Sequence, residues 1–271
     1  MNYKDKLVLL RKELKNMDRV MIAFSGGVDS TFLVKVSGDV LGKNAIAVTA
    51  KSFAFPEREL RDAVQFCRQE GISHLMIESK ELDDPEFSKN PFNRCYLCKK
   101  QLFSKILGIA AEYGVKYIVE GSNVDDLSDY RPGRQALEEL GIKSPLLQAG
   151  LTKEEIRLLS KEYGLATWDK PSFACLSSRI PYGQEINEKK LKMIDLAEQY
   201  LHDLGFRQVR VRHHGDIARI EVSPQENTKI VQSNLAQKIY KTFADIGFTY
   251  TTLDLKGYRS GSMNEKINTS S

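Results

Sequence analysis

The chain has 271 residues and a net charge of +4; 41% of its residues are hydrophobic and 28% are charged. These values are typical of a globular protein. No apolar run approaches the roughly 20 residues that a membrane-spanning helix needs, and the polar N-terminus lacks the apolar core of a signal peptide. We therefore expect a cytoplasmic protein without a membrane partner. The mild positive charge does not by itself indicate a nucleic-acid-binding protein.

The first two-thirds of the chain alternates between short apolar runs and amphipathic segments. We expect strands at 19–24, 44–50, 72–78 and 116–121, and helices at 29–41, 55–69, 97–113 and 153–163. Strands separated by helices indicate a parallel sheet that is covered on both faces. The predicted fold class is therefore α/β, with a doubly wound parallel sheet.

The order of elements changes after residue 183. We expect a helix at 188–204, strands at 208–213 and 218–222, a helix at 227–246 and a strand at 249–255. This pattern predicts a smaller α+β domain. The expected organisation is a nucleotide-binding domain at 1–168, an inter-domain active-site loop at 169–183 and a C-terminal domain at 184–271.

A glycine-containing loop follows the first expected strand and opens the first expected helix; its residues are Ser25, Gly26, Gly27, Val28, Asp29 and Ser30. The two glycines let the backbone approach a phosphate, and the helix N-terminus attracts an anion. Asp29 either holds the loop or helps to bind Mg²⁺. The sequence of this loop matches neither the Walker A motif nor the dinucleotide-binding fingerprint. The flanking strand and helix favour a phosphate site over a simple serine-rich turn.

The motif Ser-Gly-Gly-Val-Asp-Ser resembles the PP-loop of the ATP pyrophosphatases. The resemblance implies the adenine nucleotide α-hydrolase-like fold of that superfamily and cleavage of ATP between its α and β phosphates. The substrate would be adenylylated, and a nucleophile would then displace AMP. Amide-forming members use ammonia from a glutaminase domain, for which this chain has no obvious motif, so sulfur is the alternative nucleophile.

Three cysteines are placed where sulfur chemistry would need them. Cys95 and Cys98 form a C-x-x-C motif at the start of an expected helix, whose N-terminus and neighbouring basic residues would lower the pKa of both thiols. Cys175 lies in the loop at 169–183. Three thiolates can hold a 4Fe–4S cluster through three of its irons. A zinc site with a fourth ligand, a redox disulfide and inert thiols are the other interpretations.

The fourth cysteine, Cys67, lies on the apolar face of its expected helix together with Leu60, Ala63 and Val64. We expect it to be a buried core thiol.

Longer segments extend the resemblance over nearly the whole chain. Residues 121–133, 175–183, 210–221 and 253–264 are similar to segments of the LarE family, sulfur transferases that help to make the nickel-pincer nucleotide cofactor. The resemblance implies that pyridinium-3,5-biscarboxylic acid mononucleotide is the substrate and that each of its carboxylates becomes a thiocarboxylate. One form of the family sacrifices a cysteine sulfur. The other has three cysteines and a 4Fe–4S cluster, and Cys95, Cys98 and Cys175 match that form.

The resemblance also implies roles for individual residues. Ser25, Gly26, Gly27, Asp29 and Ser30 would hold the ATP phosphates and Mg²⁺. Further nucleotide or metal ligands would be Asp125, Asp126, Asp129 and Arg131, unless these form a solvated acidic loop, and Ser178 and Arg179 resemble phosphate ligands. Arg210 and Arg212 alternate along an expected strand, so both would present a guanidinium to one face, for a phosphate or a carboxylate. An ordinary exposed strand face is the alternative.

Two other functions are compatible with the sequence. A PP-loop tRNA thiolase would use the same loop and cysteines, although no RNA-binding module is recognisable. A non-enzymatic metal or cluster carrier would use ATP only as a signal. For the sulfur transferase, we expect sulfide or another sulfur donor as co-substrate and a homo-oligomer as the assembly, the latter from the family resemblance.

Overall fold

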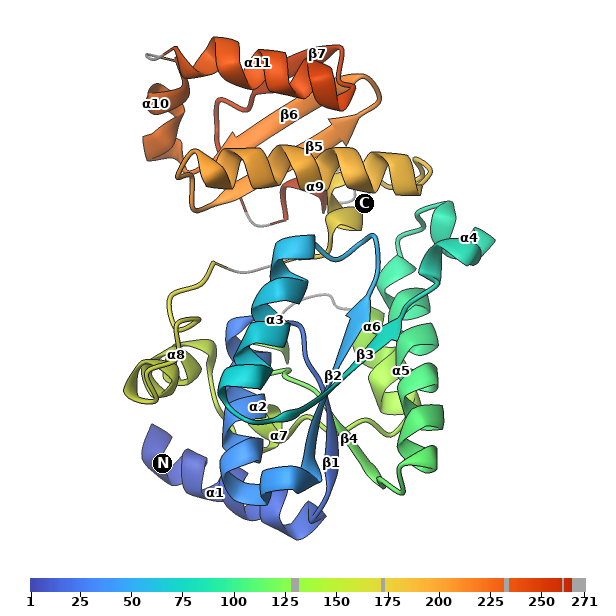
Figure 1. Ribbon diagram of the computed structural model, residues 1–271, viewed down its shortest axis with the longest axis vertical. Helices are drawn as coiled ribbons and strands as arrows, with labels where there is room; N and C mark the ends of the chain where they lie inside the picture. Colours follow the sequence, from blue (N-terminus) through green and yellow to red (C-terminus); the bar gives the residue numbers. More distant parts are fainter. Residues whose placement is uncertain (128–131, 172–173, 232–233, 260, 265–271) are drawn as a thin grey trace. The chain divides into compact units, whose positions relative to one another are not determined.

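The computed structural model describes residues 1–127, 132–171, 174–231, 234–259 and 261–264. The chain divides into two compact units, one made of 1–87 and 92–173 and the other of 88–91 and 174–271 (Figure 1). The short segment 88–91 therefore belongs with the C-terminal part of the chain. The domain boundaries expected from the sequence stay a prediction.

The first unit contains a parallel sheet of four strands in the order β3 (Ser73–Glu78), β2 (Ala45–Lys51), β1 (Val20–Ala23) and β4 (Tyr117–Val119). In the centre of the sheet, Val20 is paired with Ala45 on one side and with Tyr117 on the other. The two central strands, β1 and β2, are almost wholly apolar, as expected for strands buried on both faces. This sheet confirms the predicted α/β fold.

Helices cover both faces of the sheet (Figure 1). Val20 and Ile22 belong to a core shared with α1 (Tyr3–Met17), α2 (Val28–Leu41), α3 (Glu57–Gln69) and α8 (Lys153–Glu162). Met21 lies between them in sequence and belongs to the opposite core, with α5 (Arg94–Glu112) and α6 (Pro132–Glu139). The alternation follows from the two-residue period of a strand.

Cys67 lies in the first of these cores and is 1% exposed. Burial raises the pKa of its thiol to about 12. The expectation of a buried core thiol therefore agrees with the structure.

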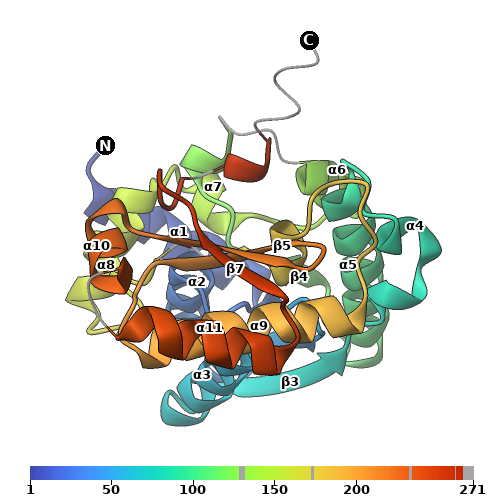
Figure 2. The ribbon, with the colours of Figure 1, turned by 90° about the horizontal axis from the view of Figure 1, so that it is seen from above.

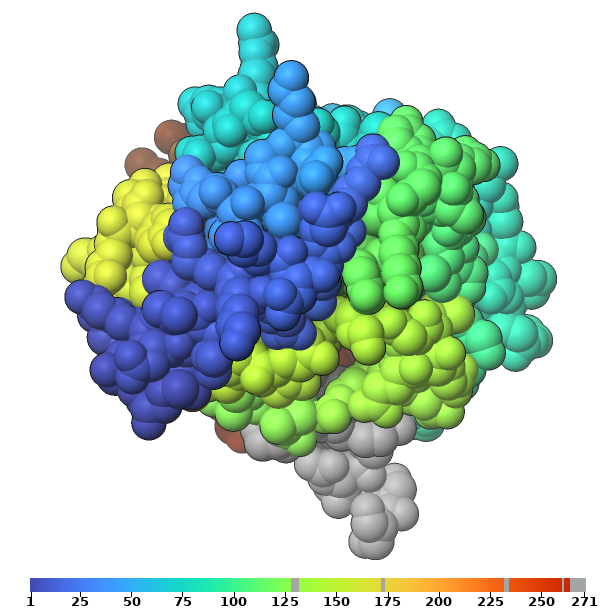
Figure 3. All heavy atoms as spheres, turned by 90° about the horizontal axis from the view of Figure 1, so that it is seen from below, coloured from blue at the N-terminus to red at the C-terminus, as the bar shows by residue number. Residues whose placement is uncertain are grey.

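The N-terminal helix α1 was not expected from the sequence. The side chain of Asn2 caps it by accepting hydrogen bonds from the N–H groups of Lys4 and Asp5. The helix lies against α8 (Figure 3, blue and yellow). Lys6 on α1 forms an ion pair of 2.7 Å with Glu155 on α8. Three short helices, α4 (Pro85–Ser88), α6 and α7 (Pro145–Gln148), also gave no clear sequence signal.

The second unit is a small α+β structure. Its sheet has the order β5 (Val209–His214), β6 (Ile217–Val222), β7 (Tyr250–Leu253), with an antiparallel first pair and a parallel second pair. Helices α9 (Glu188–Asp203) and α11 (Leu235–Ile246) lie side by side along one face of this sheet (Figure 2).

The single helix predicted at 227–246 is wrong. The structure has α10 (Asn227–Val231) and α11 instead, with Asn234 in a turn as the N-cap of α11. Asparagine is a poor residue for a helix interior, because its side chain competes for backbone hydrogen bonds. None of the helices in the described ranges combines the length and apolar character needed to cross a membrane.

Candidate active site

The phosphate loop joins β1 to α2, as predicted. Gly26 has a φ of +69°, a conformation that favours glycine, and Gly27 is the N-cap of α2. The hydroxyl of Ser30 donates to the carbonyl of Gly27 at 3.3 Å and lies 3.1 Å from the hydroxyl of Ser25. These bonds close the loop over the helix N-terminus, where backbone N–H groups and the helix dipole favour an anion.

The segment after β4 lies against this loop. A Cβ atom at Gly121 would be only 3.0 Å from the backbone nitrogen of Ser30. Strands β1 and β4 are neighbours, while β2 and β3 lie on the other side of β1, so the strand order reverses between β1 and β4. Ligands of doubly wound sheets bind at the carboxyl ends of the strands at such a reversal.

Asp29 is paired with a lysine that the sequence did not single out. The Nζ atom of Lys153, the first residue of α8, lies 2.5 Å from Asp29 Oδ2. Burial raises the pKa of Asp29, and Lys153 opposes that rise without cancelling it. The other oxygen, Oδ1, is buried and has no hydrogen-bond partner among the described residues. A buried carboxylate oxygen without a hydrogen-bond partner is suited to bind a cation.

Two of the predicted acidic residues gather at the same place. They lie in a short 3₁₀ helix, Val124–Leu127. Asp125 Oδ2 accepts a hydrogen bond of 2.6 Å from the backbone N–H of Lys153, and Asp126 contributes to the raised pKa of Asp29. Asp129 and Arg131 lie outside the described residues, so their predicted roles stay predictions.

Cys95 and Cys98 lie in the first two turns of α5, in the first unit. Cys95 is exposed and Cys98 is half-buried. Residues three apart on a helix are neighbours on its surface, so both thiols belong to one side of α5. The ammonium of Lys100, a neighbouring basic residue, contacts the hydroxyl of Tyr96 and the carboxylate of Glu139.

A hollow of about 320 Å³ lies between the start of α5 and the segment after β4. Its lining includes Lys99, Ser122, Asp126 and Lys143. The hollow therefore lies beside Asp126, and Lys99 is its one lining residue from α5.

Cys175 belongs to the second unit, where it is half-buried at the start of a short 3₁₀ helix, Leu176–Arg179. The guanidinium of Arg179 holds this segment by donating to the carbonyls of Ala174 and Cys175 and to the hydroxyl of Ser178. Arg179 also makes two bonds of 2.9 Å to the carboxylate of Glu198 on α9.

Arg179 is fully buried, with 0% exposure. Burial favours a lower pKa for Arg179, but the ion pair with Glu198 outweighs it and raises the pKa. Burial likewise favours a higher pKa for the carboxyl of Glu198, but Arg179 outweighs burial and lowers that pKa. The observed contacts show Arg179 holding the loop, whereas its predicted role as a direct phosphate ligand stays a prediction.

Arg210 and Arg212 are buried rather than on an exposed strand face, with 6% and 5% exposure. Arg212 donates to Glu221 at 2.7 Å, to the hydroxyl of Ser262 and to the carbonyl of Ser178. Arg210 lies over the ring of Tyr258, 5.1 Å from its centroid.

Burial, and secondarily the charge of Arg179, lower the pKa of Arg210 to about 10. Three guanidiniums (Arg179, Arg210, Arg212), here called the arginine cluster, lie around the carboxylates of Glu198 and Glu221. Arg219 also pairs with Glu221, so the positive charges outnumber the carboxylates here. A buried group with surplus positive charge is suited to an anionic ligand.

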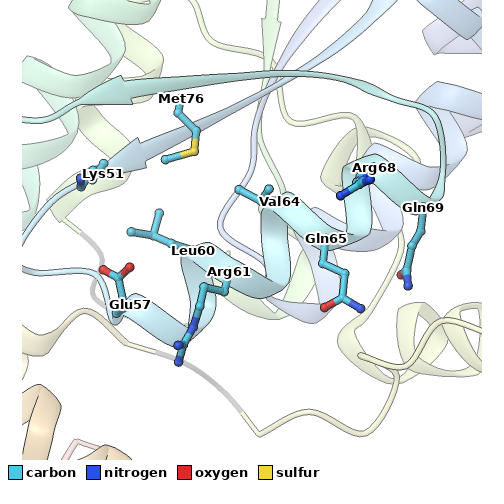
Figure 4. Close-up of a pocket in the computed structure, with 9 residues that line it drawn as sticks. All are labelled: Lys51, Glu57, Leu60, Arg61, Val64, Gln65, Arg68, Gln69 and Met76. Carbon is cyan, nitrogen blue, oxygen red and sulfur yellow. The ribbon is translucent and has the colours of Figure 1, made fainter.

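The groove between α3 and the edge strand β3 is separate from all of these residues. It has a volume of about 760 Å³ and is lined by Lys51, Glu57, Leu60, Arg61, Val64, Gln65, Arg68, Gln69 and Met76 (Figure 4). No residue of the phosphate loop lines it.

Among the described residues, no group of three or more His, Cys, Asp or Glu side chains is arranged to hold a metal ion. Of the three cysteines predicted as cluster ligands, two lie in the first unit and one in the second. The cluster therefore stays a prediction.

The parallel sheet and the phosphate loop define a PP-loop ATP pyrophosphatase. A GMP synthase chain of Methanococcus vannielii, a member of that superfamily, is 25% identical over 171 residues, which cover 58% of this chain and 53% of that protein. No protein-family model matches the chain.

Two relatives match over nearly the whole length. Pyridinium-3,5-bisthiocarboxylic acid mononucleotide synthase of Lactiplantibacillus plantarum is 37% identical over 97% of this chain and 95% of its own. The uncharacterized protein slr1717 of Synechocystis is 46% identical over 97% of this chain and 98% of its own. The chain therefore belongs to the LarE family of ATP-dependent sulfurtransferases.

Proposed function

We propose that this enzyme adenylylates the carboxylates of pyridinium-3,5-biscarboxylic acid mononucleotide and converts them to thiocarboxylates, with a 4Fe–4S cluster delivering the sulfur. The observation that carries the proposal is the phosphate loop with its buried, paired Asp29, found in a chain of the LarE family. The synthase of L. plantarum, by its name, makes the corresponding bisthiocarboxylic acid mononucleotide.

In the first half-reaction, the N–H groups of Gly26 and Gly27 and the hydroxyls of Ser25 and Ser30 bind the phosphates of ATP. Asp29 Oδ1 is the atom available to Mg²⁺, since Oδ2 is held by Lys153. Bound Mg²⁺ would neutralise the departing pyrophosphate. Asp125 fixes the backbone of Lys153 and so keeps its ammonium on Asp29. The predicted ligands Asp129 and Arg131 would complete this site.

The arginine cluster binds the anionic groups of the substrate. The guanidiniums of Arg179 and Arg212 contact Glu198 and Glu221, and Arg210 lies over the ring of Tyr258 as the third guanidinium of the cluster. Ser178 lies beside both paired arginines, because its hydroxyl accepts from Arg179 and its carbonyl accepts from Arg212. Ser178 therefore offers a hydroxyl next to the bound phosphate or carboxylate.

Cys95, Cys98 and Cys175 would hold the cluster through three of its irons and leave the fourth open to a sulfur ligand. Within the second unit, Asn90, five residues before Cys95, donates hydrogen bonds to the carbonyls of Ile180 and Pro181.

The first test follows the fate of ATP. Purified enzyme with MgATP, the biscarboxylic nucleotide and sulfide should form AMP and pyrophosphate, and neither should form when the carboxylated nucleotide is omitted. Release of ADP and phosphate, or the same AMP formation with tRNA in place of the nucleotide, would contradict the proposed substrate and reaction.

The second test concerns the cluster. Anaerobically purified protein should be brown and absorb near about 400 nm. Cys95→Ala, Cys98→Ala and Cys175→Ala should each lose colour and iron, whereas Cys67→Ala should keep both, because Cys67 lies in the core of the first unit. Colourless anaerobic protein that contains zinc would contradict the cluster.

We further propose a cytoplasmic homo-oligomer that takes sulfide or another sulfur donor as co-substrate. The reducing cytoplasm keeps exposed thiols such as that of Cys95 available as ligands. Sedimentation of the holoenzyme tests the assembly, and a single species with the mass of one chain would contradict it.

A further inference from the structure

Lys170 connects two parts of the first unit that are distant in sequence. It ends the segment 168–170, here called the connector, and precedes Cys175 by five residues. Its Nζ atom lies 2.7 Å from Glu59 Oε2, 3.3 Å from Asp62 Oδ2 and 3.4 Å from the carbonyl oxygen of Gly26. One ammonium group therefore contacts both α3 and the phosphate loop.

Glu59 lies directly beneath the loop. It is 2% exposed, and a Cβ atom placed on Gly26 would be 3.6 Å from Glu59 Oε2. A carboxylate buried this deeply needs a cation nearby, since desolvation strongly disfavours an unpaired charge. The ammonium of Lys170 is the nearest cation at 2.7 Å, while Arg58 Nε lies 3.6 Å from the other oxygen. Glu59 thereby fixes the charge of Lys170 at the underside of the loop.

This contact orients the peptide between Gly26 and Gly27. The described part of the chain contains no cis peptide bond. In a planar trans peptide the C=O and N–H groups point in opposite directions. Because the Gly26 carbonyl points towards Lys170, the N–H of Gly27 points away from Lys170.

The backbone of the connector is fixed separately. Arg157 on α8 donates hydrogen bonds of 2.7 Å and 2.8 Å to the carbonyls of Trp168 and Lys170. The connector is thus held by its backbone on α8 and by the side chain of Lys170 on the phosphate loop. A change in the loop on ligand binding would reach the connector through that side chain.

We propose that Lys170 is a positioning residue: it orients the Gly26–Gly27 peptide for the pyrophosphate portion of ATP and transmits occupancy of the loop to the connector. The inference rests on the proposed function, because it requires ATP to bind at this loop. It adds a residue outside the phosphate loop to the control of the adenylylation step.

Trp168 makes the connector observable. It is the chain's single tryptophan, and its ring lies under the ammonium of Lys161 at 4.6 Å. In the wild-type holoenzyme, titration with magnesium α,β-methylene-ATP should change Trp168 emission, and calorimetry should give the dissociation constant. In Lys170→Met we expect the analogue to bind about tenfold more weakly, because a factor of this size corresponds to the loss of one good polar contact. We also expect no change of Trp168 emission when the analogue saturates this variant.

Two further variants separate positioning from folding. Lys161→Met removes a lysine that contacts Trp168 without reaching the loop, and should keep both the wild-type dissociation constant and an emission change on binding. Lys170→Met leaves Glu59 buried with a weaker partner and should lower the melting temperature. Adding Glu59→Gln should restore most of the melting temperature, but neither the affinity nor the emission change.

The outcomes distinguish this inference from the proposed function. If the wild type binds the analogue and folded Lys170→Met behaves identically, Lys170 does not position the loop and the inference fails alone. Recovery of affinity together with melting temperature in the double variant would also overturn it, because the role would then be structural only. If the wild type does not bind the analogue, the proposed function fails and the inference fails with it.

Discussion

The ammonium group of Lys153 lies 2.5 Å from Asp29 Oδ2, although 124 positions separate the two residues in the chain. The pair joins the first turn of α2 to the first residue of α8. It occupies one carboxylate oxygen of Asp29 and leaves the other buried and without a partner among the described residues. This asymmetry gives Asp29 a structural contact and an available ligand atom at once.

Asp29→Asn should abolish adenylylation while stabilising the fold at neutral pH. The pKa of Asp29 is raised in the folded protein, chiefly by burial. Such a carboxyl disfavours the folded state once the pH exceeds its normal pKa, because its charged form is poorly solvated. We expect a gain of about 1 kcal/mol for Asp29→Asn at pH 7. Melting curves measure it, and the gain should shrink as the pH falls and Asp29 itself becomes protonated; a gain that grows in acid would contradict this.

Lys153→Met should move the acid limb of the pH–activity profile to higher pH. Lys153 lowers the pKa of Asp29, so its removal lets burial raise that pKa further. The carboxylate needed for Mg²⁺ then forms only at higher pH. Initial rates of AMP formation across a pH series provide the measurement. Lys161→Met, on the same helix and exposed, serves as the matched control and should leave the profile unchanged.

Breaking the pair of Arg179 and Glu198 should destabilise the second unit strongly. Both side chains are buried, with 0% and 3% exposure. Removing one partner leaves an uncompensated charge, which costs about 3–5 kcal/mol. Urea unfolding of Arg179→Met and Glu198→Gln measures this loss. On the same helix, Glu188→Gln breaks an exposed pair with Lys192 and should change stability by less than about 1 kcal/mol; equal losses in both pairs would contradict the prediction.

Gly121→Ala should impair nucleotide binding by displacing the first turn of α2. The new methyl group would lie 3.0 Å from the backbone nitrogen of Ser30, and backbone atoms cannot move aside as a flexible side chain can. We expect at least about tenfold weaker binding of an ATP analogue, measured by calorimetry. Gly108→Ala is the control: a Cβ atom there meets nothing within 4 Å, so it should stabilise α5 by about 0.5–1 kcal/mol.

The phosphate loop and the parallel sheet could be predicted because their signals are local. The strand 20–23 is an apolar run, and the glycines and serines that follow it are consecutive in the sequence. The same applies to the capping box of Thr152 and Glu155, which marks the start of α8. Helix α1 was missed, although Asn2 at its N-cap and the spacing of Leu10 and Leu14 could have indicated it.

The partners of the site residues could not be predicted because they depend on tertiary packing. Nothing in the local sequence of Lys153 or Lys170 indicates that their ammonium groups reach Asp29 and Glu59. Arg210 and Arg212 lie on one strand, β5, as expected from the sequence. Their burial depends on tertiary packing, which includes the ring of Tyr258 at Arg210 and the hydroxyl of Ser262 at Arg212.

The most direct test of sulfur delivery through a cluster counts the thiocarboxylates that each chain forms. Anaerobic enzyme with MgATP, the biscarboxylic nucleotide and excess sulfide should form many thiocarboxylates per chain, with one AMP for each, and the mass of the polypeptide should stay unchanged. Mass spectrometry of both the nucleotide and the protein gives these quantities in one experiment. Formation of a single thiocarboxylate per chain, with loss of sulfur from Cys175, would contradict delivery through a cluster, and thiocarboxylate formed without AMP would contradict the reaction itself.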